Sequence, residues 1–170
     1  SMSCAATSSS YERLCSCEFP SPPPASPSRP PPPPEAVWWR IRASTTSSGF
    51  AWDVSRLRFY DERGGALTPD LAYEGNSYLG CCKEGCTASS ACSYGAQNAV
   101  FGQGVWGGRK ASAQDSFWIG AYWRSLGDDA VMSRVVFTQG ALHRAAVVHV
   151  DMRHADGEWA LMASTSAAFE

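Results

Sequence analysis

Four of the seven cysteines lie within twelve residues, at Cys81, Cys82, Cys86 and Cys92. Thiols at this density serve either disulfide bonding or zinc coordination. Zinc sites usually take two separated Cys-x2–4-Cys pairs, so one crowded segment favours disulfides. The remaining cysteines, which are candidates for the same bonds, are Cys4, Cys15 and Cys17. We therefore predict disulfides of open connectivity and no metal site. Disulfides imply an oxidising compartment: a secreted, cell-surface or organelle-lumen protein, including a thylakoid lumen or a ciliary surface.

His149, Asp151 and Arg153 alternate along one apolar run, so they share one face of a predicted strand. A histidine beside an aspartate can ligate a metal, or can act as a base held in place by a carboxylate. The alternative is an ordinary solvated sheet face. Because no serine or cysteine nucleophile can be placed beside them, we expect no enzyme and no catalytic residues.

Aromatic and arginine side chains lie near one another in sequence at several points of the predicted domain. Together they are typical of protein-interface hot spots, and aromatic rings with polar neighbours also suit sugars. The alternative for each tryptophan is a place in the core, since seven tryptophans in a small domain must be mostly buried. The predicted ligand- or partner-binding residues are Trp52, Trp106, Arg109, Tyr122 and Arg124.

These residues must be positioned by β-strands, because apolar residues recur with a period of two over short runs separated by glycine-rich turns. The predicted strands are 38–43, 56–60, 117–123, 131–138 and 145–153. Trp39, Ile41 and Ala43 face one side of the first strand, and Val131, Val135 and Phe137 are expected to share a face of the fourth. Asp156-Gly157 predicts a hairpin. Many short strands without a long amphipathic helix indicate an all-β antiparallel sandwich or jelly roll.

Ten of the eleven prolines lie between Pro20 and Pro34. Proline fixes φ near −65° and donates no hydrogen bond, so a proline run forms a stiff polyproline II segment. We predict an extended Ser/Pro-rich arm over residues 1–35 and one sandwich domain over residues 36–170. The arm is interpreted as a spacer or as a partner-binding segment centred on Pro30, Pro31, Pro32, Pro33 and Pro34.

Several segments resemble, in order, the discoidin-like (F5/8 type C, galactose-binding-like) family. They are 37–43, 51–61, 97–102 followed by Trp106, 117–120, and 147–151 followed by 155–159. The resemblance implies a jelly-roll sandwich without catalytic activity that binds sugars, phospholipid head groups or protein surfaces through loops at one end. Phe101 and Tyr122 stand where the family has aspartates, one of which helps to hold calcium. We therefore expect no cofactor, with calcium as the alternative.

Composition and charge exclude other classes. The net charge is −2, with 14 basic and 16 acidic residues well mixed, which gives no footprint for nucleic acid. No run of 18 apolar residues exists, so we expect no transmembrane segment. The sequence thus predicts a peripheral subunit that docks onto a larger protein assembly through its arm and sandwich loops. The alternative is a carbohydrate-binding domain that uses the loops at one end.

Overall fold

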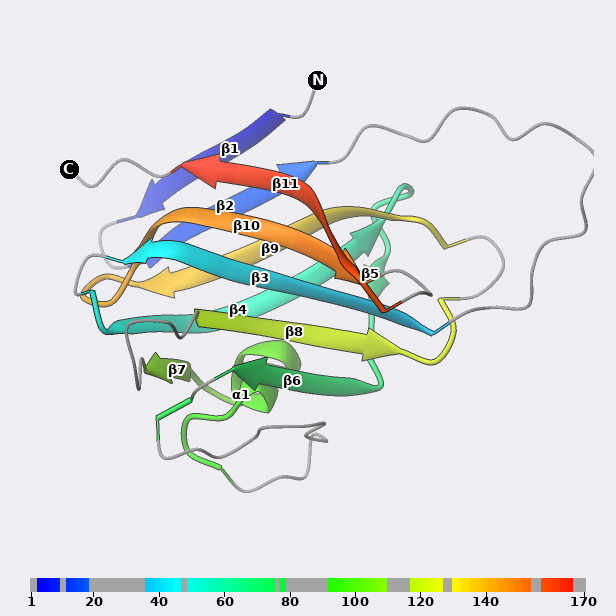
Figure 1. Cartoon of the computed structure of the whole chain (residues 1–170). Coiled ribbons are helices and arrows are strands. Elements are labelled where there is room, and N and C mark those ends of the chain that lie inside the picture. Colours follow the sequence, from blue (N-terminus) through cyan, green and yellow to red (C-terminus); the bar gives the residue numbers. More distant parts are fainter. Residues whose placement is uncertain are drawn as a thin grey trace, which may run out of the picture.

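Two antiparallel β-sheets pack face to face in the computed structural model (Figure 1). It describes residues 3–9, 12–18, 36–46, 49–75, 77–78, 92–109, 117–126, 130–153 and 157–166. The six-stranded sheet has the order β1 (Ser3–Ser9), β2 (Glu12–Glu18), β9 (Met132–Gly140), β4 (Ala51–Asp61) and β5 (Ala66–Leu67), with β7 (Trp106–Arg109) also on β4. The five-stranded sheet has the order β11 (Trp159–Ser166), β10 (Ala145–Arg153), β3 (Val37–Thr46), β8 (Phe117–Trp123) and β6 (Leu71–Gly75). The prediction of an all-β sandwich is confirmed.

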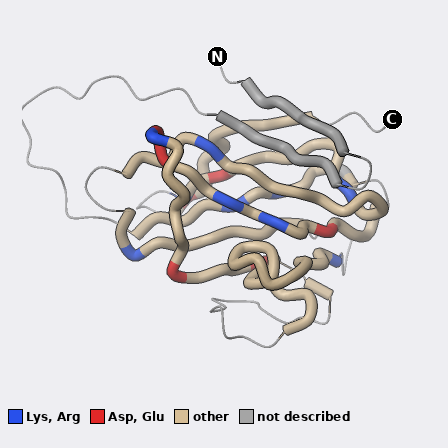
Figure 2. Tube along the Cα trace, turned by 180° about the vertical axis from the view of Figure 1, so that it is seen from behind, with Lys and Arg blue, Asp and Glu red and all other residues tan. Residues whose placement is uncertain are grey.

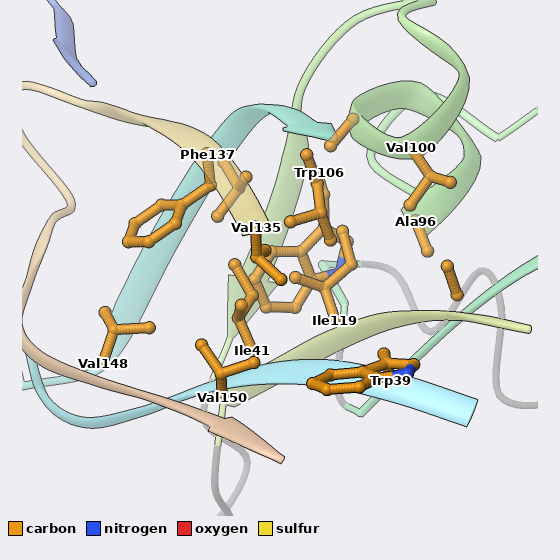
Figure 3. Close-up of a cluster of buried hydrophobic side chains, with 14 of the residues drawn as sticks. Trp39, Ile41, Ala96, Val100, Trp106, Ile119, Val135, Phe137, Val148 and Val150 are labelled. Carbon is orange, nitrogen blue, oxygen red and sulfur yellow. The ribbon is translucent and has the colours of Figure 1, made fainter. Parts of the chain in front are cut away.

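The core lies between the sheets and is built by the alternation that the sequence shows. Figure 3 shows side chains from β3, β8, β9 and β10 converging there, with Trp106 from β7 and with Ala96 and Val100 from the helix α1 (Ala96–Phe101). Ile41, Ile119 and Val150 have no exposed surface, and Trp39 retains 4%. Because successive side chains along a strand point to opposite faces of the sheet, the neighbours of these buried residues point away from the core.

One predicted face is wrong at its first residue. Val131 precedes β9 and is 44% exposed, whereas Val135 and Phe137 are buried as predicted. The β4–β9 register shifts between Tyr60 and Asp61, and Met132 is the buried residue at the beginning of β9. Such an irregularity adds a residue to one strand and breaks the period of two.

The predicted arm also needs correction. Residues 3–9 and 12–18 do not lie outside the fold, because β1 pairs with β2 in antiparallel fashion and β2 pairs with β9 along its whole length. Strands of polar sequence can be held at a sheet edge by backbone hydrogen bonds alone. The pattern of apolar residues therefore does not predict β1 and β2. The Pro-rich stretch, including Pro30 to Pro34, lies outside the described residues.

The helix α1 (Ala96–Phe101) is short, which agrees with the expectation of no long helix. Gly102 ends it in the left-handed conformation at φ 76°, which glycine adopts without a Cβ penalty. Arg58 on β4 donates from Nη1 to the carbonyl oxygens of Ala99 and Val100, at 3.2 and 2.6 Å, and so caps the helix end. No helix among the described residues is long and apolar enough to cross a membrane.

Candidate functional site

Six side chains form one continuous surface cluster at the left-hand end of the sandwich in Figure 1, where β4 begins and β7 ends. We call it the loop-end cluster. It joins β4 and β7 to the turn between β9 and β10 and to the segments on either side of residues 79–91. Its members are Phe50, Asp53, Tyr78, Tyr94, Arg109 and His143.

Asp53 is the centre of the loop-end cluster. Its Oδ1 accepts a hydrogen bond from Arg109 Nη1 at 2.7 Å, and its Oδ2 lies 2.9 Å from His143 Nδ1. The backbone N–H of Asp53 donates to the carbonyl oxygen of His143 at 2.8 Å. The β4–β7 register places Arg109 opposite Ala51, two residues from Asp53. The three side chains therefore hold each other in place across three separate segments.

Aromatic rings extend the loop-end cluster on both sides of this ionic centre. Phe50 packs edge-on against His143, with ring centroids 5.7 Å apart. The Arg109 guanidinium lies 5.4 Å from the ring centroid of Tyr78, which meets Tyr94 at 5.5 Å. Phe50, Tyr78 and Tyr94 are 56%, 46% and 38% exposed. The arrangement is suited to binding, because it presents aromatic faces around charged groups that are already fixed in position.

Two of the predicted ligand residues are core residues. Trp52 and Trp106 have no exposed surface and meet edge-to-face at 5.6 Å. Trp52 Nε1 donates to the side-chain oxygen of buried Gln139 at 2.9 Å, and this amide also bonds both backbone groups of Ala145. For these two tryptophans the prediction of a surface role is wrong, because the indole of Trp52 binds within the core and neither ring reaches solvent.

The other three predicted residues lie apart. Arg109 belongs to the loop-end cluster, whereas Arg124 is exposed beyond the end of β8, at the opposite end of the sandwich (Figure 1). The backbone N–H of Arg124 donates to Asp70 at 2.8 Å. Tyr122 is partly exposed on the outer face of the five-stranded sheet, where it packs on Trp38 at 4.3 Å. The five residues therefore do not form one site.

The predicted trio on β10 meets β3 on this outer face. In the β3–β10 register, Asp151 pairs with Arg40, His149 with Arg42 and Arg153 with Trp38. Asp151 is only 2% exposed, because Arg40 Nε and Arg42 Nε donate to its Oδ2 at 2.8 and 3.0 Å. The carboxylate serves as the anchor of two arginines, which supports the interpretation of a structured sheet face over that of a base or a metal ligand.

Two ionisable groups on this face have shifted pKa values. Burial lowers the pKa of His149 below its ordinary 6.5, the nearby Arg42 lowers it further, and Asp151 opposes both. Burial also raises the pKa of the Tyr73 hydroxyl, whose O–H group donates a hydrogen bond to the carbonyl oxygen of Trp39 at 3.1 Å. His149 therefore favours its neutral form and Tyr73 remains a hydrogen-bond donor.

The seven predicted disulfide residues fall in three parts of the chain. Cys92 is disulfide-bonded, whereas Cys81, Cys82 and Cys86 lie outside the described residues. Cys4, Cys15 and Cys17 lie in β1 and β2, with Cys4 opposite Cys17. No group of three or more histidine, cysteine, aspartate or glutamate side chains suited to a metal occurs within the described ranges.

The segment before β7 bears on the calcium alternative. The side-chain nitrogen of Asn98 lies 2.9–3.2 Å from the carbonyl oxygens of Cys92, Ser93 and Val105. A neutral amide donor thus binds the three carbonyl oxygens that a calcium ion could otherwise take as ligands. Phe101, which stands where the family has an aspartate, is the last residue of α1. The loop is held by hydrogen bonds of the chain itself.

Sequence reasoning missed most of the loop-end cluster. Phe50 is the one further residue that the sequence could have indicated. A large apolar side chain directly after a turn glycine would be exposed to solvent unless it packs on a neighbouring side chain or binds a partner. Asp53 and His143 are 90 positions apart, and only the sheet topology brings them together. Tyr78 and Tyr94 lie on either side of the cysteine-rich segment, and no local pattern in the sequence indicates that their rings meet.

Comparison with known proteins adds no relative. The chain matches no protein-family model, and neither the curated proteins nor the solved structures give a match. The discoidin-like resemblance therefore remains a prediction from sequence motifs.

Proposed function

We propose that the chain is a non-catalytic binding module, a peripheral subunit that docks onto a larger protein assembly through the loop-end cluster. The observation that carries this proposal is the unbroken series of contacts from exposed Phe50, through His143, Asp53 and Arg109, to exposed Tyr78. Aromatic residues and arginine dominate the binding energy of protein interfaces. Large apolar side chains that gather on a surface mark such contacts.

The fixed geometry of the loop-end cluster supports binding. Asp53 is engaged by two basic side chains, so little conformational entropy remains to be lost when a partner covers them. A partner that buries this ion pair would also strengthen it, since water no longer screens the charges. These properties favour a specific interface over a loose encounter surface.

We further propose that the two sheets form the jelly roll of the discoidin-like family, which uses loops at one end of the sandwich. In the same proposal the Pro-rich residues 30–34 supply a second contact with the assembly, and the assembly lies in an oxidising compartment, which the predicted disulfides would require. The alternative of glycan binding by the loops loses its expected residue set, because Trp106 is buried and Arg109 and Tyr122 lie apart.

The test is site-specific photocrosslinking. The full chain carries benzoylphenylalanine in place of Tyr78, and a control chain carries it in place of Val131, which is 44% exposed at the opposite end of the sandwich. Both are irradiated in native extract, and the captured protein is purified and tested for binding to the unmodified chain. We expect one protein captured at position 78 alone that rebinds in isolation. Equal capture at both positions, or a captured protein that does not rebind, contradicts the proposal.

A further inference from the structure

The outer face of the five-stranded sheet carries a second surface, distinct from the loop-end cluster. It is the nearer layer in Figure 1, and no element of the described part lies in front of it there. The strand register arranges its side chains in three rows. These rows, from β11 to β6, are Trp159–Arg153–Trp38–Tyr122–Leu71, Leu161–Asp151–Arg40–Gly120–Tyr73 and Ser164–His149–Arg42–Trp118–Gly75. We call these fifteen residues the outer aromatic face.

Two glycines of the outer aromatic face make room for rings directly on the backbone. A Cβ on Gly75 would lie 2.0 Å from Trp118 Nε1, and a Cβ on Gly120 would lie 2.7 Å from Tyr73 Cζ. Because only glycine lacks that atom, Trp118 and Tyr73 can lie over neighbouring strands. These two rings then leave room for further rings beside them.

The rings form a connected layer. Trp38 contacts Tyr73 at 4.8 Å and Tyr122 at 4.3 Å, and Tyr73 contacts Trp118 at 5.3 Å and stacks with Trp159 at 6.4 Å. Tyr73 is 5% exposed, whereas the four tryptophan and tyrosine rings around it remain partly exposed. The sheet therefore presents a rigid aromatic platform whose ring positions are fixed before any ligand arrives.

Arginines are set into this platform. The Arg40 guanidinium lies 4.0 Å from the ring centroid of Trp159 and 5.8 Å from that of Trp118, and Arg42 shares Asp151 with it. Arg153 is exposed and donates from Nε to the carbonyl of Gly157 at 2.9 Å. Three arginines face one aspartate in the three rows, so two positive charges remain in a chain whose net charge is −2. The face is therefore complementary to an anion.

The area of the outer aromatic face favours a single polymer chain over a folded protein as the partner. Four strand spacings of about 4.8 Å and four residues of about 3.4 Å along β3 give an area of about 260 Å². A stable protein interface buries about 800 Å² on each partner. A single polymer chain lying across the strands fits the smaller area. Ring faces carry negative potential and attract C–H groups, and a sugar ring presents several of these on one flat face that can stack on an indole. The isolated methylenes of Asp and Glu side chains offer no such face.

We propose that the outer aromatic face binds an anionic polysaccharide. Sugar rings stack on the partly exposed rings of Trp38, Trp118 and Trp159. The carboxylate or sulfate groups of the polymer pair with those N–H groups of Arg42 and Arg153 that do not bind Asp151 or Gly157, since a guanidinium carries five N–H donors. This site is independent of protein docking through the loop-end cluster, so either proposal can fail without the other.

The test measures binding of the full chain by isothermal titration calorimetry to four polymers. They are polygalacturonate, which carries carboxylates, dextran sulfate, which carries sulfates, neutral dextran and polyglutamate. We expect one or both anionic polysaccharides to bind, with the better one identifying the acid group, and neutral dextran to bind at least about tenfold more weakly. Polyglutamate that binds as tightly as the polysaccharides would overturn the proposal in favour of an acidic-peptide site. Absence of binding to both anionic polysaccharides would overturn it outright.

Matched variants locate the site. Arg153→Gln should weaken binding about tenfold, whereas Arg56→Gln, which removes another exposed arginine from the opposite sheet, should change it less than twofold. Trp159→Ala should weaken binding while Val131→Ala leaves it unchanged. Thermal melting of each variant confirms that it is folded. Equal losses in Arg153→Gln and Arg56→Gln would refute the assignment, because the attraction would then follow net charge alone.

Discussion

The anchoring role of Asp151 leads to a quantitative prediction for Asp151→Asn. The wild-type Asp151 side chain is 3% exposed, and its carboxylate accepts three hydrogen bonds, from Arg40 Nε at 2.8 Å and from Arg42 Nε and Nη2 at 3.0 and 3.3 Å. Asparagine keeps the shape of the side chain but removes the negative charge. Both guanidinium groups would then lack their shared anion.

The magnitude follows from the exposure of the partners. Removing one member of a buried ion pair costs about 3–5 kcal/mol. The side chains of Arg40 and Arg42 are 17% and 30% exposed, so water compensates part of the loss, and the amide retains one acceptor. We therefore expect a loss of about 2–3 kcal/mol in the free energy of unfolding. For a chain of this length that corresponds to a decrease of about 4–12 °C in Tm.

Urea denaturation and thermal melting measure this loss, with Asp70→Asn as the control. Asp70 is exposed and accepts a backbone N–H from Arg124, so its replacement should cost less than about 1 kcal/mol. A double-mutant cycle with Arg42→Gln should give a coupling free energy of about 1 kcal/mol or more with Asp151→Asn. An Asp151→Asn chain within about 0.5 kcal/mol of wild type, or no coupling, would refute the reasoning.

Three further perturbations test other parts of the structure. Gln139→Leu should destabilise the chain by about 2–4 kcal/mol in urea, because it leaves Trp52 Nε1 and a backbone amide buried without their acceptor. Gly120→Ala should cost about 1–3 kcal/mol in the same assay, because the new Cβ would lie 2.4 Å from the Trp39 carbonyl oxygen and 2.7 Å from the Tyr73 ring. Wild type should lose stability as pH falls below about 6.5, since the unfolded state binds a proton at His149 more readily than the folded state. His149→Gln should flatten this loss between pH 7.5 and 5.5, and an unchanged pH profile would contradict it.

The strands β3 and β10 could be predicted because each carries its own alternation, whereas the sequence predicts no strand at β7, whose Trp106 lies in the core. Trp39 and Ile41 on β3, and Val148 and Val150 on β10, are buried as their period of two indicates. The hairpin β1–β2 could not be predicted in this way, since its strands are polar and are held through pairing with β9. A pattern of apolar residues within one strand predicts which side chains are buried. It does not predict that the strand pairs with the edge of a sheet through backbone hydrogen bonds.

The surfaces depended on register, which the sequence alone does not encode. The outer faces of β3 and β10 could each be predicted, but their alignment, which pairs Arg40 with Asp151, came from the structure. Figure 2 shows basic and acidic residues interspersed along the strands on the far side, as the mixed composition predicts. The charge excess of the outer aromatic face emerges only when strands distant in sequence lie side by side.

Protein docking through the loop-end cluster is tested most directly by the dissociation constant between the chain and the protein captured at position 78. It is measured for wild type, Tyr78→Ala and Val131→Ala. Tyr78 is an exposed ring beside Arg109, so we predict binding about tenfold weaker in Tyr78→Ala and unchanged within twofold in Val131→Ala. Equal dissociation constants for wild type and Tyr78→Ala would contradict docking through the loop-end cluster.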